Sequence, residues 1–224
     1  MKKNFLKYTL LLCLIFQNSL HSQDTAACMQ DLSIFAEYVK VKNYASASEP
    51  WLRVRENCPD INAAIYTYGE RILKNNIKNG TPQVIEASKI DLIKLYDEWL
   101  RYFPKNKNKS IVGDVTGRKA QALLDFKMAE LNEVYKIFDE AFTTDAASFT
   151  NPKFLYNYFK TLYDRYKSGD KEVSMEMLFN KYEEVSEKFE IETVALAKKL
   201  DIILKKEEEG KPLTSREQRR KKVY

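Results

Sequence analysis

Histidine is almost missing from this chain of 224 residues, since His21 is the only one. His21 lies in an N-terminal segment with the features of a signal peptide, so the mature chain would contain none. A histidine general base, a histidine-assisted nucleophile and a histidine metal site would then be excluded. The sequence also has no glycine-rich phosphate loop, no metal-ligand spacing and no serine-nucleophile motif. We therefore predict no catalytic residue, no metal and no cofactor.

Glycine and proline are also scarce, with six residues of each, whereas hydrophobic residues make up 44% of the chain. A β fold with many turns needs more residues of both kinds, and long helices need few. The composition predicts an all-α protein with a sizeable core.

The first 22 residues resemble a secretory signal peptide. Three lysines precede the apolar run Tyr8–Phe16, and a polar segment that ends at Ser22 follows it. The run is too short to span a bilayer as a helix, which takes about 20 residues. We predict a signal peptide over 1–22, export to the periplasm, the envelope or the medium, and no transmembrane segment after cleavage. The alternative is an uncleaved N-terminal anchor.

Two cysteines remain in the mature chain, and their spacing predicts a disulfide-tied helical hairpin. Two apolar stripes have helical intervals: Cys28, Leu32, Phe35 and Val39, then Ala47, Trp51, Val54 and Cys58. With a turn near Asn43, each cysteine lies fifteen residues from the turn and closes its stripe. A disulfide between Cys28 and Cys58 is permitted in an exported protein. The alternative is a pair of buried free thiols.

The same hairpin resembles a tetratricopeptide repeat. In a 34-residue unit that begins at Cys28, large residues occupy positions 11, 17 and 24, a small residue occupies position 20 and proline occupies position 32. These are Tyr38, Tyr44, Trp51, Ala47 and Pro59. Phe35 departs from the consensus, which has a small residue at position 8. The resemblance implies antiparallel helix pairs stacked as a short α-solenoid.

A second unit begins at Asn62 and places Gly69 at position 8. The connection between its two helices, over 75–83, looks like a turn longer than the repeat allows. Its second helix, 84–103, ends at Pro104, which makes the unit about eleven residues longer than the consensus repeat. Across residues 28 to about 165 the chain resembles exported tetratricopeptide-like proteins of Bacteroidota. The motifs that carry this resemblance are Pro50-Trp51, Asn57-Cys58-Pro59, Leu95-Tyr96-Asp97, Phe103-Pro104 and Gly113-Asp114-Val115. That family carries no assigned activity, so the resemblance implies architecture alone.

Further helical patterns fill residues 112–204. We therefore predict one repeat domain over 23–204, from the end of the signal peptide to the last apolar helix. We expect a lysine-rich loop at 105–110, a helix capped by Asp114 or Thr116, another over 131–142, and one that Asn151 and Pro152 begin. Two shorter helices are expected near 178–189 and 194–204. The polar, basic segment 205–224 is predicted as a tail that is disordered, forms an exposed helix or continues into a longer chain.

The charge does not indicate a nucleic-acid binder. Removal of residues 1–22 takes away three lysines and lowers the formal net charge from +5 to +2. The segment 205–224 alone carries a net charge of +4, so the rest of the mature chain is close to neutral. We therefore predict no nucleic-acid partner.

These observations favour a non-enzymatic scaffold of the periplasm or envelope that binds a protein or peptide. First-helix residues of such repeats face a groove, and Tyr38, Asn62 and Tyr66 are of the right type to face it; ordinary packing between helices is the alternative. Two other functions stay open. One is a carboxylate-based hydrolase of an envelope polysaccharide, and the other is a structural subunit of an envelope secretion or motility complex.

Overall fold

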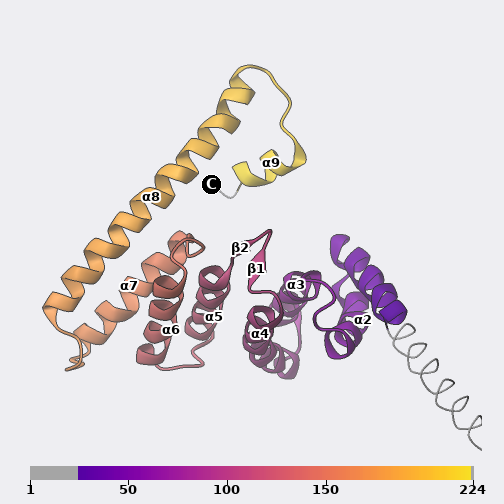
Figure 1. Ribbon diagram of the computed structural model, residues 1–224, viewed down its shortest axis with the longest axis horizontal. Coiled ribbons are helices and arrows are strands. Elements are labelled where there is room, and N and C mark those ends of the chain that lie inside the picture. Colours follow the sequence, from indigo (N-terminus) through magenta and orange to yellow (C-terminus); the bar gives the residue numbers. More distant parts are fainter. Residues whose placement is uncertain (1–24, 223–224) are drawn as a thin grey trace, which may run out of the picture. The chain divides into compact units, whose positions relative to one another are not determined.

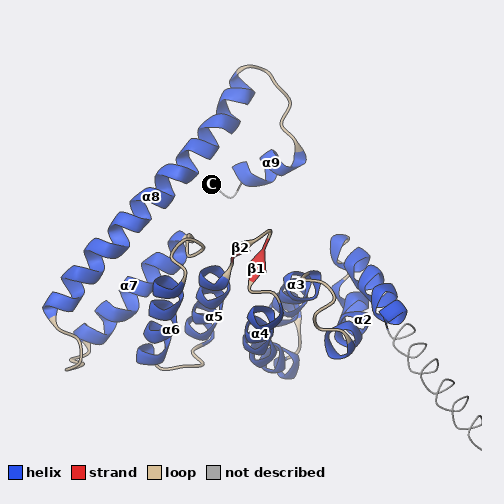
Figure 2. Cartoon of the chain, in the orientation of Figure 1, coloured by secondary structure: helices blue, strands red, loops and turns tan. Residues whose placement is uncertain are grey.

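The computed structural model describes residues 25–222, so the predicted signal peptide lies outside the described residues. The described chain is all-α apart from one short hairpin, and its helices pack as adjacent antiparallel pairs in a helical-repeat arrangement, as predicted (Figures 1 and 2). It forms two compact units, which divide between Pro104 and Lys105. The boundaries predicted for a single repeat domain, 23–204, therefore do not coincide with the compact units.

Unit 1 contains a helix over residues 25–40, α2 (Tyr44–Asn57), α3 (Ala64–Asn79) and α4 (Pro82–Tyr102). The first turn lies where it was predicted, because Asn43 caps α2 by accepting a hydrogen bond from the Ser46 amide at 3.3 Å. The predicted disulfide between Cys28 and Cys58 is confirmed, and their Cα atoms lie 6.3 Å apart. The two helices of this hairpin are therefore tied at the end opposite their turn.

Trp51 lies at the centre of unit 1. Its ring is buried, and its Nε1 donates a hydrogen bond of 2.8 Å to the carbonyl of Ile65. Gly69 allows this contact, because a Cβ atom there would lie 2.7 Å from the tryptophan ring. Ala47 is also buried, and Pro59 and Pro104 each follow a helix end by two residues. Ala47, Trp51 and Gly69 thus pack inside unit 1, whereas Tyr38, another large position of the pattern, is exposed.

The connection between α3 and α4 is shorter than predicted. The helix α3 continues through Asn79, and only Gly80 and Thr81 separate it from α4. Thr81 caps α4 with its side chain and Pro82 occupies the first turn, so the chain restarts a helix at once. The prediction of a long turn over 75–83 was wrong because asparagine and lysine were taken as loop formers.

Unit 2 begins with a hairpin of two short strands, β1 (Lys105–Asn106) and β2 (Lys109–Ser110), where we expected a loop. Five helices follow, and from α6 on each packs on the one before it. They are α5 (Val112–Phe126), α6 (Leu131–Thr144), α7 (Pro152–Lys167), α8 (Met175–Glu208) and α9 (Ser215–Lys221).

The start of α5 is capped from another part of the chain. Neither Asp114 nor Thr116 is the N-cap; Ile111 holds that position without a side-chain cap. Instead, the amide of Gly113 donates to Asp145 Oδ2 at 3.3 Å, and the amide of Asp114 donates to Ser148 Oγ at 3.1 Å. The loop after α6 therefore satisfies the first amides of α5, which local sequence does not reveal.

The C-terminal half of unit 2 also differs from the prediction. The two helices expected near 178–189 and 194–204 form one continuous helix of 34 residues, α8, which passes the predicted boundary at 204. The tail then folds back as α9, whose capping box joins Thr214 and Glu217. Lys206 and Thr214 lower the pKa of Glu217 to about 2. In residues 25–222, no helix is both long and apolar enough to cross a membrane.

Candidate protein-interaction surfaces

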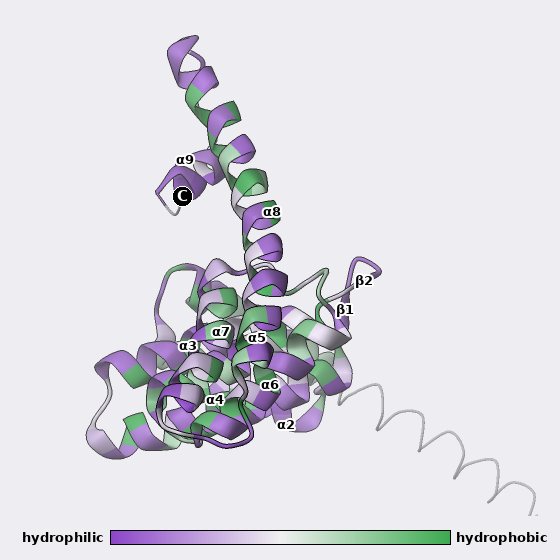
Figure 3. Cartoon of the chain, turned by 90° about the vertical axis from the view of Figure 1, so that its left-hand side faces the viewer, coloured by the Kyte–Doolittle hydropathy of each residue, from purple (hydrophilic) through white to green (hydrophobic). Residues whose placement is uncertain are grey.

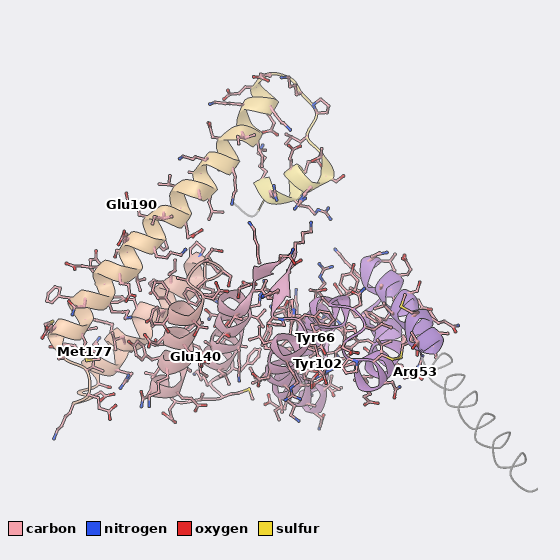
Figure 4. The ribbon with its side chains drawn as sticks, in the orientation of Figure 1. Arg53, Tyr66, Tyr102, Glu140, Met177 and Glu190 are labelled. Atoms are coloured by element: carbon pink, nitrogen blue, oxygen red, sulfur yellow. A yellow bond between two sulfur atoms is a disulfide. The ribbon has the colours of Figure 1, made fainter. Side chains whose placement is uncertain are left out.

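The three residues predicted to face a groove do not share one surface. Tyr66 is fully buried, and its hydroxyl donates a hydrogen bond of 2.9 Å to the carbonyl of Pro59. Its ring stacks on that of Tyr102. Both residues are labelled in Figure 4. The prediction for Tyr66 was therefore wrong, because a satisfied hydroxyl lets tyrosine pack in a core. Tyr38 and Asn62 are exposed, but the Asn62 side chain accepts a hydrogen bond of 2.8 Å from the Ala64 amide at the start of α3.

A groove of unit 1 instead runs between α2 and α4, the second helices of the two pairs. It has two compartments of about 410 Å³ and 560 Å³ that share Leu52, Asp91 and Lys94. Residues of α2 and α4 line it in the same order along the two helices, so these helices run parallel, with part of α3 between them. We call this feature the α2–α4 groove.

The smaller compartment is charged and is organised by Arg55. The Arg55 guanidinium donates to Glu98 at 2.7 Å and to Asp91 at 2.9 Å, and it lies 5.2 Å from the centre of the Trp51 ring. Burial opposes the charge on Arg55, but hydrogen bonds to the two carboxylates outweigh it and raise the arginine pKa. Arg55 therefore stays charged and fixes both acids in the groove wall.

Two further cations of α4 open into the same compartment. Lys94 and Arg101 are exposed, line the groove and lie seven residues apart, so they project from the same side of the helix. Neither forms an ion pair within residues 25–222. Arg55, Lys94 and Arg101 balance the three acids of this compartment, Glu56, Asp91 and Glu98. Since Asp91 and Glu98 both bind Arg55, Lys94 and Arg101 can still bind an acidic group from a ligand.

The larger compartment is mainly apolar. Its rim carries Leu52, Val84 and Ile90, each at least two-fifths exposed, and the side of Trp51 contributes to its wall. Exposed apolar side chains gathered in a groove indicate an interaction site, and such a groove can bind the apolar face of a helix. The α2–α4 groove is thus apolar at the Val84 end and charged, with side chains of both signs, at the Arg101 end.

Unit 2 has a separate apolar cavity of about 460 Å³ between α7 and α8. Tyr156 and Phe159 of α7 and Tyr182 of α8 line it, and the Phe159 and Tyr182 rings meet edge to face at 5.7 Å. Hydrophobic residues recur along α8 in Figure 3. We call the surface around this cavity the α7–α8 face.

The acidic side chains offer no group that resembles a metal site. Among residues 25–222, no three or more of His, Cys, Asp and Glu gather where they could hold an ion. Asp91 and Glu98, the pair nearest to a cleft, both bind Arg55. Their contacts are those of structural ion pairs that position an arginine.

The residues of the α2–α4 groove were not singled out from the sequence. Arg55 lies 36 residues before Asp91 and 43 before Glu98, so no local spacing joins them. A usable signal was the position of Arg55, one turn after Trp51 and beside the apolar stripe of α2. A charged residue at the edge of a buried stripe indicates a partner on a neighbouring helix.

Comparison with known proteins adds no function. The chain matches no protein-family model, no curated protein and no solved structure. The resemblance to tetratricopeptide-like proteins and the prediction that the chain is not an enzyme therefore both stay predictions.

Proposed function

We propose that this protein is an exported, non-enzymatic helical-repeat scaffold, and that its α2–α4 groove binds a helical segment of a partner protein. The observation that carries this proposal is the division of the groove into an apolar compartment and a charged one in which Lys94 and Arg101 have no ion-pair partner within residues 25–222. The disulfide and the signal-peptide pattern support export to an oxidising compartment.

The shape and charges of the groove define the ligand. From Val84 to Tyr102 its α4 wall spans about 27 Å at 1.5 Å per residue, the length of a helix of about 18 residues. Two parallel helices form its walls, which suits a third helix laid between them. The partner segment should therefore be an amphipathic helix with apolar residues at one end and carboxylates at the other, the latter beside Lys94 and Arg101.

The test places a photo-crosslinking residue at Ile90 in native cells, with a second at Val41, an exposed residue outside the groove, as the control. We expect the Ile90 probe to capture one partner and the Val41 probe not to do so. Mass spectrometry of the crosslinked peptide should identify an amphipathic helix with acidic residues at one end.

Two further variants test the groove itself. Leu52→Glu should abolish capture by disrupting the apolar compartment, and Lys94→Glu with Arg101→Glu should weaken it by reversing the charge. Capture that survives all three substitutions, or a crosslinked segment with no acidic end, would contradict the proposal. Circular dichroism of each variant confirms that unit 1 is still folded.

A further inference from the structure

The α7–α8 face exposes four aromatic rings on neighbouring helices. Tyr156 and Tyr163 of α7 are 60% and 46% exposed, and Tyr182 and Phe189 of α8 are 56% and 40% exposed. One exposed ring is ordinary, but several around an apolar cavity indicate a contact surface. These rings lie on unit 2, so they are separate from the α2–α4 groove.

The charges on this face are divided between its two helices. The exposed row of α7 alternates lysine and tyrosine at helical spacing: Lys153, Tyr156, Lys160, Tyr163 and Lys167. The α8 side carries Glu183 and Glu190, which are two helical turns apart; Glu190 lines the cavity and is labelled in Figure 4. Within the described chain neither glutamate forms an ion pair, whereas Lys153 pairs with Asp125 of α5 and Lys160 pairs with Asp164 of its own helix.

We propose that the α7–α8 face binds a second copy of this chain, with α7 of each copy packed antiparallel on α8 of the other. A two-fold axis parallel to the helices and between them produces this arrangement and makes both contacts identical. Each contact sets lysines against glutamates. Because this axis keeps each residue at its own height along the helices, and Phe159 lies beside Tyr182, Lys160 would face Glu183 and Lys153 would face Glu190. A two-fold axis across the helices would set like charges against each other.

The self-complementary charge distinguishes a second copy from an unrelated partner. A foreign helix would have to match a positive α7 and a negative α8 at once, whereas a second copy carries both rows in the required order. The aromatic rings of the two copies would fill the cavity between α7 and α8. This proposal uses only residues of unit 2 and does not depend on the proposed function of the groove.

Sedimentation velocity of the purified protein over a range of concentrations tests the proposal through charge swaps. The first variant carries Glu183→Lys and Glu190→Lys, and the second carries Lys153→Glu and Lys160→Glu. Each alone should raise the dissociation constant of the dimer at least about tenfold, because like charges then face each other. The four substitutions together restore opposite charges and should return the constant to near its original value.

The outcomes separate the possible arrangements. A wild-type protein that stays monomeric at all concentrations overturns the proposal. A dimer that neither variant weakens overturns it too, because α8 packed on α8 pairs like charges in the wild type and in every variant. A combined variant that stays as weak as the single variants also overturns it. Leu52→Glu, in the groove of unit 1, is the matched control and should leave the dimer unchanged.

Discussion

Arg55 is a buried cation, and its energetic role differs from that of the exposed arginine two positions before it. Its side chain is 9% exposed and holds two carboxylates, whereas the side chain of Arg53 is 46% exposed and pairs with Asp31 and Glu49. Removing a buried partner leaves its counterions uncompensated, and an exposed pair contributes little. The two arginines of α2 thus form a matched pair for an experiment.

We predict that Arg55→Met lowers the free energy of unfolding of unit 1 by about 2–3 kcal/mol, since Asp91 and Glu98 keep about a third of their exposure and are partly screened. Arg53→Met should cause a much smaller loss. Urea denaturation followed by tryptophan fluorescence measures both. Equal losses in the two variants would show that the buried pairing of Arg55 adds no stability.

Gly69 offers a second residue-scale prediction, in which the usual effect of alanine is reversed. Gly→Ala in a helix normally stabilises by up to about 1 kcal/mol. At Gly69 the new methyl group would lie 2.7 Å from the Trp51 ring, which its hydrogen bond to Ile65 holds in place. Gly69→Ala should therefore destabilise unit 1 by about 1–3 kcal/mol.

A double-variant cycle tests this cause by urea denaturation. Trp51→Phe removes the part of the ring that Gly69→Ala would touch, so the double variant should lose less stability than the two single losses combined. Strict additivity would contradict the proposed clash.

The sequence showed which residues have the size that helix packing requires. It did not always show which neighbours would contact them. Ala47, Trp51 and Gly69 sit in the core because only their sizes fit between crossing helices. Tyr66 was misplaced, because the spacing of tyrosines does not reveal that the Pro59 carbonyl can satisfy its hydroxyl. The Arg55 cluster joins residues on two helices and could be found only once α2 and α4 were placed side by side.

At the scale of elements, the tertiary cap of α5 depends on one carboxylate. Burial opposes the charge on Asp145, but hydrogen bonds from Ser110, Ser148 and the Gly113 amide outweigh it, so its pKa lies below the usual 3.8. The unfolded chain therefore takes up a proton at higher pH than the folded chain does. The stabilisation that the Asp145 carboxylate provides is therefore fully present well above pH 4. It is lost as the pH falls through the pKa of this carboxyl in the folded chain.

We predict that Asp145→Ala lowers the free energy of unfolding by about 1–2 kcal/mol at pH 7, the range known for helix caps. The gap between wild type and variant should narrow as the pH falls from 5 to 3, because the wild-type carboxyl becomes protonated. Urea denaturation followed by circular dichroism at several pH values measures the gap. A gap that is constant with pH would exclude the carboxylate as the cause.

The length of α8 shows why an element boundary was misjudged. We assigned Val194 to the apolar stripe of the last predicted helix. That assignment puts the stripe out of phase with Phe189 and so implies that the helix breaks near residue 190. Thr193 keeps the phase between Phe189 and Leu196, and no glycine or proline interrupts the segment. A continuous helix follows from that phase. Caps were easier to predict where they are local, as at Asn151, than where a distant loop provides them, as at α5.

At the scale of the whole molecule, two compact units share one chain, and the only covalent crosslink of the described residues lies in unit 1. Both tryptophans, Trp51 and Trp99, lie in unit 1 as well. Tryptophan fluorescence therefore reports the unfolding of unit 1 alone, whereas circular dichroism reports the helices of both units. This division of probes makes the independence of the units measurable.

We predict that reduction of the Cys28–Cys58 disulfide destabilises unit 1 by about 3–4 kcal/mol, because the unfolded chain regains the freedom of a loop of about 30 residues. In urea, the fluorescence transition should move to lower denaturant, while the part of the dichroism transition due to unit 2 stays in place. The Cys28→Ser, Cys58→Ser variant is the control and should not respond to the reductant. If both probes shifted together on reduction, the two units would unfold as one cooperative body, and unit 2 would owe part of its stability to a crosslink that it does not contain.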